Sequence, residues 1–474
     1  MLIGREEETR QLKKAYESAE SEFVAVYGRL RVGKTYLVRE VFKDKFTFYH
    51  TGLSGVSKSE QLAFWRQALE RYGHKCSKAL RNWAEAFFEL EELIQQSKAK
   101  KKVIFIDEMP WLDTPGSKFV TWLEAFWNGW AAARNDVFLI ACGSAASWII
   151  RKVFRNRGGL HNRVTYRIPV EPFTLGECEA MTKRLGMKAT RYDILEGYMV
   201  MGGIPFYWSL LDKEKSMAGN IDSLFFKESG QLHYEFNELY SSLFRQPENY
   251  IKVVTVLALN QRGMTREEII KEAGIHNNGD TSQLLDDLQQ CGFISMKYPF
   301  GGGKTKVIYH LIDNFTLFHF CFLNTENATD ENYWTTNIQS LVRNAWADLS
   351  FEHVCFQHIK QIKNALGIGG VATKVYSWKC GRNDVYRRGA QIDLLIERAD
   401  RVINVCEVKF SQEKYSISKY RELSFRNKLE QFRMVIKKRM ALHLTFISTY
   451  GLKYNQYSGF VAREVTADDL FKSE

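Results

Sequence analysis

The sequence predicts an α/β protein of several domains, with a mostly parallel sheet in its N-terminal third. Its 474 residues are too many for one core, since a domain usually holds roughly 100–200 residues. Up to about residue 170, short apolar runs alternate with longer amphipathic stretches, which is the pattern of strands joined by helices. A composition of 45% hydrophobic and 26% charged residues, with 7 prolines, excludes a disordered or collagen-like chain.

The apolar runs predict five strands, at residues 23–27, 46–50, 103–106, 137–142 and 164–168. The pattern then turns helical up to about residue 245. Residues 250–311 predict three helices and a hairpin, as in a winged helix. A helix around 341–366 and a strand-rich block follow. We therefore expect four domains, at residues 1–170, 171–245, 246–325 and 326–474, of which the second is a helical lid.

The sequence contains no run of about 18 apolar residues, and its opening, MLIGREEETR, is charged where a signal peptide would be apolar. We expect a cytoplasmic protein with no membrane partner. The eight cysteines stand singly, without a CxxC pair, so we expect buried reduced thiols rather than a zinc or redox site.

A phosphate-binding loop is predicted at residues 28–35, GRLRVGKT, between an apolar strand and an amphipathic helix. Its backbone N–H groups and the helix N-terminus can hold phosphates, Lys34 can reach the β and γ oxygens, and the Thr35 hydroxyl can ligate Mg²⁺. A glycine turn that precedes Lys-Thr by chance is the alternative. The expected nucleotide-binding residues in this segment are Gly28, Arg29, Arg31, Val32, Gly33, Lys34, Thr35 and Tyr36.

Polar residues follow two other predicted strands, at the strand ends where such sheets bind ligands. Asp107 is expected to hold the magnesium shell, and Glu108 to polarise the attacking water. Ser144 could sense the γ-phosphate or simply cap a helix, and Ser147 is a second candidate. Four arginines could stabilise transition-state charge or be ordinary surface residues: Arg155, Arg157, Arg163 and Arg167.

The winged-helix segment has little charge suited to reading DNA. Its third helix carries Asp286 and Asp287, and residues 246–322 hold 7 basic against 8 acidic residues. We therefore favour a domain that contacts protein or the first domain over direct base reading.

A C-terminal hairpin concentrates acidic residues. If residues 399–401 form its turn, the register pairs positions that sum to 800, so Asp393 faces Glu407, and Lys409 lies on the same face. Two opposed carboxylates repel each other, and a divalent cation would cancel that repulsion. In the alternative, Lys409 pairs with Glu407 and Asp393 stays solvated.

Several motifs together resemble the archaeal-type P-loop ATPases, a family related to AAA+ and STAND NTPases. They are IGREEE, GRLRVGKT, IFIDEMPWL, CGS, LHNR and GGIP. The resemblance implies an ASCE-type P-loop NTPase sheet that binds ATP, followed by a winged helix and a nuclease-like domain. It also implies that Arg163 matches the family's recurrent arginine and that residues 4–6 pack near the adenine.

The hairpin is similar to the PD-(D/E)XK nuclease core, with Asp393, Glu407 and Lys409 in its pattern and Glu352 as the acid of the first helix. This implies a C-terminal restriction-endonuclease-like α/β domain whose carboxylates bind Mg²⁺ and whose lysine activates water. Residues 341–474 also hold 23 Lys/Arg against 14 Asp/Glu, so +9 of the net +11 lies there. Such charge suits DNA or RNA, or an ordinary solvated face.

These features predict a Mg²⁺-dependent ATPase coupled to a nuclease-like domain that binds nucleic acid. The alternative is an ATP-switched regulatory or scaffolding module whose C-terminal domain binds nucleic acid or protein without cleaving. A protein partner at the winged helix and an oligomer are compatible with both.

Overall fold

In a computed structural model, the chain divides into two compact units. The first contains Met1–Pro172, Leu239–Pro247 and Ser282–Cys291, and the second contains Phe173–Glu238, Glu248–Thr281 and Gly292–Glu474. The finer division into four domains stays a prediction. The structure describes residues 2–155, 159–160, 162–244, 246–260, 262–301, 307–325, 329–338, 340–380, 389–436 and 439–473.

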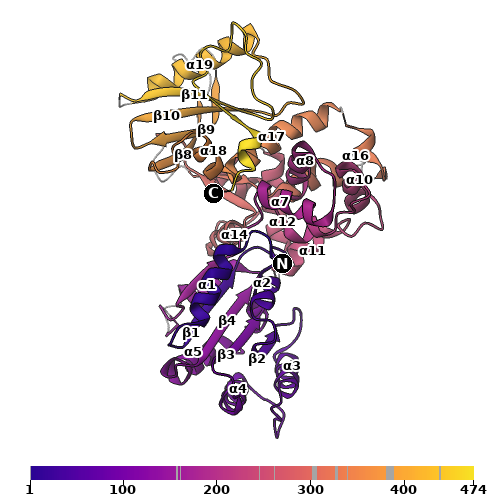
Figure 1. Ribbon diagram of the computed structural model, residues 1–474, viewed down its shortest axis with the longest axis vertical. Coiled ribbons are helices and arrows are strands. Elements are labelled where there is room, and N and C mark those ends of the chain that lie inside the picture. The colour runs from indigo at the N-terminus through magenta and orange to yellow at the C-terminus, as the bar shows by residue number, and fades with distance from the viewer. Residues whose placement is uncertain are drawn as a thin grey trace. The chain divides into compact units, whose positions relative to one another are not determined.

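The first unit contains a parallel five-stranded sheet in the order β2-β3-β4-β1-β5 (Figure 1). Its strands are β1 (Glu22–Tyr27), β2 (Phe46–Thr51), β3 (Lys102–Asp107), β4 (Val137–Gly143) and β5 (Tyr166–Pro169). They confirm the five strands expected from the apolar runs, to within two residues at each end. Because all five run in one direction, their carboxyl ends lie at one edge of the sheet.

Helices cover both faces of this sheet, as the connections between parallel strands require. On one face, Tyr16 of α1 (Glu6–Tyr16) and Phe42, the C-cap of α2 (Lys34–Val41), pack on Phe138 of β4. On the other, α3 (Lys58–Arg71), α4 (Trp83–Gln96) and α5 (Phe119–Gly129) contribute a core of aromatic side chains that includes Trp65 and Trp83. The short segments are η1 (Met109–Trp111), η2 (Ala131–Ala133), α6 (Ala146–Ile149) and η3 (Ile150–Phe154).

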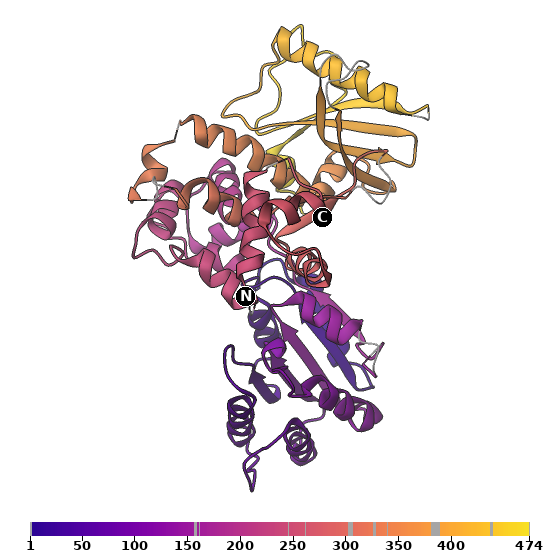
Figure 2. The same ribbon diagram turned by 180° about the vertical axis from the view of Figure 1, so that it is seen from behind.

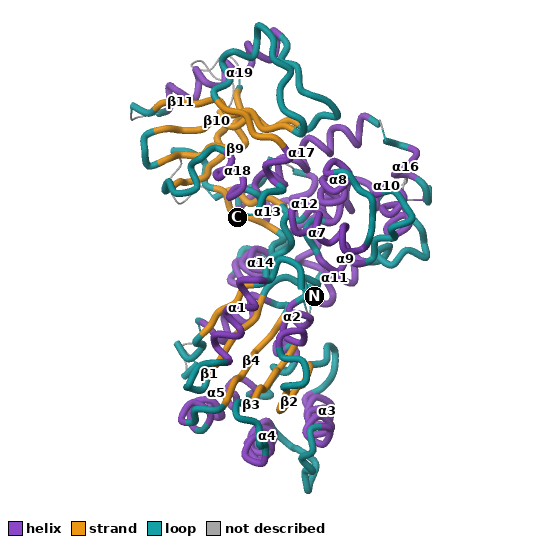
Figure 3. Tube along the Cα trace, viewed as in Figure 1, coloured by secondary structure: helices purple, strands orange, loops and turns teal. Residues whose placement is uncertain are grey.

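Helices form the N-terminal half of the second unit (Figure 3). α7 and α8 each begin with a capping box, formed by Thr174 with Glu177 and by Thr190 with Asp193. Two of the helices between β5 and residue 340, α11 and α14, belong in part to the first unit. The helices in this range are α7 (Leu175–Leu185), α8 (Arg191–Met201), α9 (Pro205–Ser209), α10 (Met217–Ile221), η4 (Asp222–Phe226), α11 (Glu235–Leu243), α12 (Glu248–Leu259), α13 (Arg266–Ala273), α14 (Gly279–Gln290), α15 (Asn314–Phe318), η5 (His319–Leu323) and α16 (Tyr333–Thr336).

The order of three helices and a hairpin predicted for residues 250–311 is present. α12, α13 and α14 are followed by the antiparallel strands β6 (Ile294–Lys297) and β7 (Ile308–Leu311). Most of α14 belongs to the first unit, where Asp287 is buried and lies 3.3 Å from Arg151. Asp287 also accepts a hydrogen bond from Gln283 at 2.7 Å. Its carboxylate therefore has structural partners, which agrees with the charge argument against a DNA-reading helix.

The second unit ends in a mixed sheet in the order β12-β11-β10-β9-β8. β8, β9 and β10 are antiparallel neighbours, whereas β10, β11 and β12 are parallel. α19 lies along one side of the sheet in both views (Figures 1 and 2), and its Phe425 and Phe432 join the core formed with the strands. The elements are α17 (Leu341–Gln357), α18 (Ile359–Ala365), β8 (Thr373–Cys380), β9 (Ala390–Arg398), β10 (Val402–Lys409), α19 (Lys419–Val435), β11 (Ala441–Ser448), β12 (Arg463–Thr466) and α20 (Ala467–Leu470).

The predicted hairpin register is confirmed. Residues 399–401 connect β9 to β10, and Leu395 pairs with Val405. Arg401 has a φ of +65°, which a residue at the end of a three-residue hairpin turn adopts. This register brings Asp393 and Glu407 to one end of the ladder, on the same face as Leu395 and Val405.

None of the helices within the described residues has both the length and the apolar character needed to cross a membrane.

Phe432→Ala should lower the free energy of unfolding by about 3–5 kcal/mol, because the fully buried ring packs on Phe300 and Trp378 and its removal leaves a cavity. Met434→Ala is the matched control on the same helix. Its side chain is 68% exposed, so the expected change is within about 0.5 kcal/mol. Urea unfolding followed by circular dichroism measures both. Equal effects of the two substitutions would contradict the described core.

Candidate functional site

The loop between β1 and α2 is closed, because the side chain of Lys34 donates to a carbonyl group of the loop itself. Gly28 and Gly33 have φ values of +150° and +89°, which a residue with a side chain rarely adopts. A Cβ at Gly28 would lie 2.3 Å from the carbonyl oxygen of Val170, so only glycine fits there. The Lys34 ammonium is buried and donates to the carbonyl oxygen of Arg29 at 2.7 Å. Gly33 is the N-cap of α2, so the N–H groups at the start of this helix face the loop.

The acidic end of β3 lies directly beside this loop. The Thr35 hydroxyl donates to Asp107 Oδ2 at 2.8 Å, and the backbone N–H of Glu108 donates to Asp107 Oδ1 at 3.0 Å. The two motifs that sequence analysis joined across 72 residues are therefore in contact at the carboxyl edge of the sheet. Hydroxyl and carboxylate oxygens are the donors that Mg²⁺ prefers, so Thr35 and Asp107 fit such an ion.

Glu108 is held in an unusual conformation. Its φ of +44° lies in the left-handed region, which costs a non-glycine residue roughly 1–3 kcal/mol and is often found at functional sites. The Ser144 hydroxyl donates to its carboxylate, and the Ser144 N–H donates to Oε2 at 3.2 Å. Burial raises the pKa of Glu108; Lys34 opposes that shift, and Asp107 adds to it. Ser144 therefore orients Glu108, and the alternative that its side chain caps the following helix is wrong, because the N-cap of α6 is Ala145 without a side-chain bond.

The other residues predicted to bind nucleotide differ in how far their side chains are buried. Arg29 and Val32 are buried in the loop, Arg31 is partly buried with a φ of +67°, and Tyr36 is 48% exposed on α2. Ser147 is buried in α6.

Arg5 is a loop contact that sequence reasoning missed. Its guanidinium is buried and donates to the carbonyl oxygens of Val32 at 3.2 Å and Glu171 at 2.8 Å. It thereby ties the loop to the segment after β5. The IGREEE motif marked the segment, but nothing in the sequence pattern showed that Arg5 bonds to these carbonyl groups.

The predicted arginines that the structure describes have different surroundings. Arg163 is exposed, two residues before Thr165, whose N–H donates to Phe23 near the start of β1. It therefore lies at the amino edge of the sheet, and a six-residue strand at about 3.3 Å per residue puts it roughly 20 Å from the loop. Arg167 lies over the Phe154 ring, Arg155 is exposed, and Arg157 lies outside the described residues.

A second cluster of charged residues forms in the C-terminal sheet. Glu352 of α17, Asp393 of β9, and Glu407 and Lys409 of β10 interact electrostatically there. Burial raises the pKa of Glu352 to about 8, and the charge of Asp393 adds to the shift. Burial opposes the charged form of Lys409, but Glu407, Asp348 and Glu352 together raise its pKa. The four residues predicted from two distant segments are therefore neighbours.

Glu407 already has cationic partners. Lys428 of α19 donates to its Oε2 at 2.7 Å, and Lys409 lies 3.7 Å from Oε1. Asp393 accepts a hydrogen bond from Gln391 at 2.6 Å. Lys428 could not be identified from the sequence, because the pattern of an amphipathic helix does not show which strand one of its lysines will face.

Lys297 is a third lysine in this cluster, and it comes from the hairpin strand β6. Burial lowers its pKa to about 8, while Asp393 and Glu352 oppose the shift. Its ammonium lies 3.3 Å from the centre of the Phe356 ring. Because Lys297 lies far from Asp393 in the sequence, no sequence pattern could have identified it as a member of this cluster.

The oxygen donors of Glu352, Asp393 and Glu407 are of the type that suits Mg²⁺. Within the described residues, however, their ligand atoms do not form a group in which all lie within 4.8 Å of one another. In the structure, lysines balance part of this negative charge.

Basic residues are frequent in the sequence around this hairpin, and many of them are exposed. Those with exposed side chains include Lys374, Lys379, Lys414, Lys419, Arg421, Arg426 and Arg439. Trp378 is buried in the sheet core, so it offers no surface for stacking. Arg382, Arg387 and Arg388 lie outside the described residues.

Known proteins are similar to this chain over much of its length. An uncharacterized protein of Methanocaldococcus jannaschii is 25% identical over 443 residues, which are 90% of this chain and 92% of that protein. Among solved structures, a Walker-type ATPase of Pyrococcus abyssi is similar at 17% identity and a TM-score of 0.49, over 67% of this chain and 95% of that one. The ORC2 protein of Aeropyrum pernix is similar at 12% identity and a TM-score of 0.44, over 72% of this chain and 96% of that one.

A family model described as an ATPase domain predominantly from Archaea matches residues 2–211. This segment contains the loop, the acidic strand end and Ser144. Residues 2–211 are therefore similar to an ATPase domain found predominantly in Archaea.

Proposed function

We propose that the chain binds ATP with Mg²⁺ at residues 28–35 and hydrolyses it at the carboxyl edge of the first sheet. One observation carries the proposal. A continuous series of hydrogen bonds links Thr35 to Asp107, Asp107 to Glu108, and Glu108 to Ser144, directly beside the closed loop. The position of β4 between β1 and β3 is compatible with the ASCE-type sheet implied by the resemblance.

Each residue has a role that follows from its position. Lys34 would exchange the Arg29 carbonyl for phosphate oxygens, since its ammonium already points into the loop. Thr35 and Asp107 would hold Mg²⁺, which supplies charge neutralisation on the phosphates when bound. The N–H groups at the start of α2 would add hydrogen bonds to the phosphates.

Glu108 would orient the attacking water and accept its proton. Phosphoryl transfer requires a positioned carboxylate more than covalent chemistry. The left-handed backbone and the two donors from Ser144 fix the direction of the Glu108 side chain. Its raised pKa makes the carboxylate a better proton acceptor than an exposed glutamate.

We also propose that the C-terminal sheet is a nuclease-like domain that takes a nucleic-acid backbone. Support comes from the order of its elements, which is two helices, three antiparallel strands, a helix and two parallel strands. It also comes from the grouping of Glu352, Asp393, Glu407 and Lys409. In this function the carboxylates would hold Mg²⁺ and Lys409 would position water. The family match ends at residue 211, so this half of the proposal rests on geometry.

A specific observation favours the alternative in which this domain binds without cleaving. Glu407 pairs with Lys428 at 2.7 Å, and the partly buried Lys297 interacts electrostatically with Asp393 and Glu352. These ammonium groups supply the positive charge that a cation would otherwise bring. ATP would then switch the binding of nucleic acid or of a protein partner, rather than a cleavage reaction.

Lys34→Ala should abolish ATP turnover by removing the contact to the phosphates, whereas Glu108→Gln should retain ATP binding and lose at least about 100-fold in turnover. Phosphate release and nucleotide titration measure the two properties. Lys43→Ala, an exposed lysine just after α2, is the control and should leave both unchanged. Turnover of Glu108→Gln at the parental rate would refute the role given to Glu108.

Arg5→Ala should weaken ATP binding by about tenfold or more, because two buried carbonyl groups at the loop lose their donor and each such loss costs about 1–3 kcal/mol. Arg10→Ala, on the same helix but 67% exposed, should bind ATP as the parent does. Isothermal titration of both variants makes the comparison. Equal affinities would show that Arg5 does not shape the loop.

If the C-terminal domain cleaves, Asp393→Ala should eliminate Mg²⁺- or Mn²⁺-dependent cleavage of labelled nucleic acid, because the cation loses a ligand. Asp400→Ala is the control, since this carboxylate lies in the turn of the same hairpin and is 44% exposed. The substrates are double-stranded DNA, single-stranded DNA and RNA. If the parental protein cuts none of them but binds at least one, the binding-only alternative holds.

A further inference from the structure

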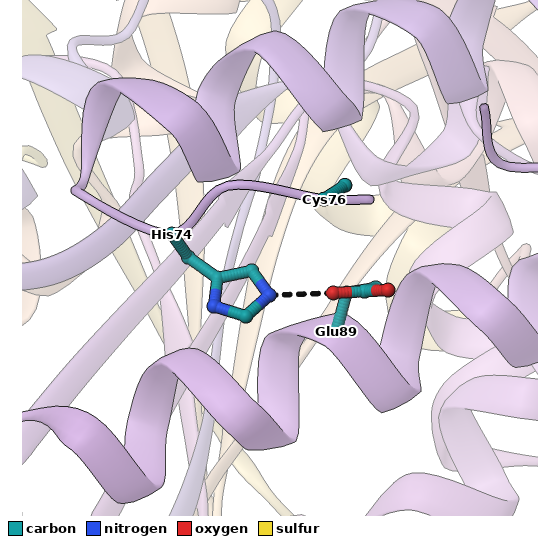
Figure 4. A group of neighbouring side chains, drawn as sticks. All are labelled: His74, Cys76 and Glu89. Atoms are coloured by element: carbon teal, nitrogen blue, oxygen red, sulfur yellow. Dashed lines mark hydrogen bonds and ion pairs between the residues drawn. The ribbon is translucent and has the colours of Figure 1, made fainter. Parts of the chain in front are cut away.

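A group of three potential metal ligands lies between α3 and α4, separate from both sites described above. His74 and Cys76 are in the connection that follows α3, and Glu89 is on α4. One ligand atom from each residue lies within 4.8 Å of the other two. Figure 4 shows the loop carrying His74 and Cys76 above the helix that carries Glu89, with the imidazole directed at the carboxylate.

The contacts within the group are short. His74 Nε2 lies 2.5 Å from Glu89 Oε2. The Cys76 sulfur lies within 4.8 Å of both of these groups. An imidazole, a thiol and a carboxylate therefore converge, two of them from the connection after α3 and one from α4.

The group is shielded from solvent on most sides. The exposed fractions of the His74 and Glu89 side chains are 9% and 23%, and Cys76 is 5% exposed. Cys76 belongs to the aromatic core formed by α3, α4 and the sheet, with Trp65 and Phe87 among its members. The partly exposed Glu89 leaves one side of the group open for a fourth, solvent ligand.

The charge around the group also suits a cation. The Glu89 carboxylate lies beside the thiol, whereas the Arg66 guanidinium donates to the Cys76 carbonyl oxygen at 3.4 Å and pairs with Glu70 at 3.0 Å. A divalent cation would displace the thiol proton and balance both the thiolate and the carboxylate.

We propose that His74, Cys76 and Glu89 bind a zinc ion. Sulfur, imidazole nitrogen and carboxylate oxygen together form the ligand set that zinc takes, whereas Mg²⁺ and Ca²⁺ prefer oxygen donors alone. Three protein ligands and one water complete a tetrahedral shell. The ion joins the connection after α3 to α4 and so stabilises the helical layer on this face of the first sheet.

This proposal differs from the prediction made from the sequence, which was buried reduced thiols rather than a zinc site. The prediction followed from the absence of a CxxC pair, that is, of two cysteines close in sequence. Here, the fold supplies the partners of a single cysteine, one from two residues upstream and one from the next helix.

The test uses full-length, untagged protein freed of metal with a chelator and titrated with Co²⁺ and then Zn²⁺. We expect one Co²⁺ per chain, a sulfur-to-cobalt charge-transfer band in the near ultraviolet, and loss of that band when Zn²⁺ displaces Co²⁺. Zn²⁺ should also raise the unfolding temperature of the parental protein.

Cys76→Ser should lose the charge-transfer band, and Glu89→Gln, which retains a hydrogen-bonding side chain at the helix, should bind Co²⁺ at least tenfold more weakly. Cys321→Ser, a partly buried cysteine of the second unit, is the control and should retain the band and the affinity. Absence of a band in the parental protein, or an unchanged band in folded Cys76→Ser, would overturn the proposal. If Cys76→Ser does not fold, unchanged Co²⁺ affinity in Glu89→Gln overturns it.

Discussion

The hydrogen bond from Thr35 to Asp107 is the contact on which the geometry of the candidate ATP site depends. It joins the first turn of α2 to the last residue of β3, so it fixes the phosphate loop against the acidic edge of the sheet. The parallel direction of the strands makes this contact available, because only then do the loop after β1, the acids after β3 and Ser144 after β4 meet at one edge. Glu108 and Ser144 extend the same network by three further hydrogen bonds.

The first sheet and its loop could be predicted from the sequence for physical reasons that are local. The strands of a parallel sheet are buried on both faces and therefore read as continuous apolar runs, and the loop has a fixed spacing of glycine, lysine and threonine. The hairpin register followed from the length of one turn, residues 399–401. Each of these features depends on residues close together in sequence.

What the sequence did not reveal depends on contacts between distant segments. Arg5 bonds to the carbonyl groups of Val32 and Glu171, and backbone carbonyl groups carry no sequence signal. Lys297 and Lys428 reach the carboxylates of the C-terminal sheet from a hairpin and a helix whose own patterns are ordinary. The placement of Arg163 at the amino edge could have been inferred from its position before a strand rather than after one.

The origin of Lys297 has a consequence for the second unit. Its ammonium belongs to β6, whereas the carboxylates it faces belong to α17 and β9. Withdrawal of β6 would leave Glu352 and Asp393 with less compensating charge in a buried setting, which is costly unless protons or cations replace it. By thermodynamic linkage, occupancy of the carboxylates by a cation and docking of that strand must therefore oppose each other.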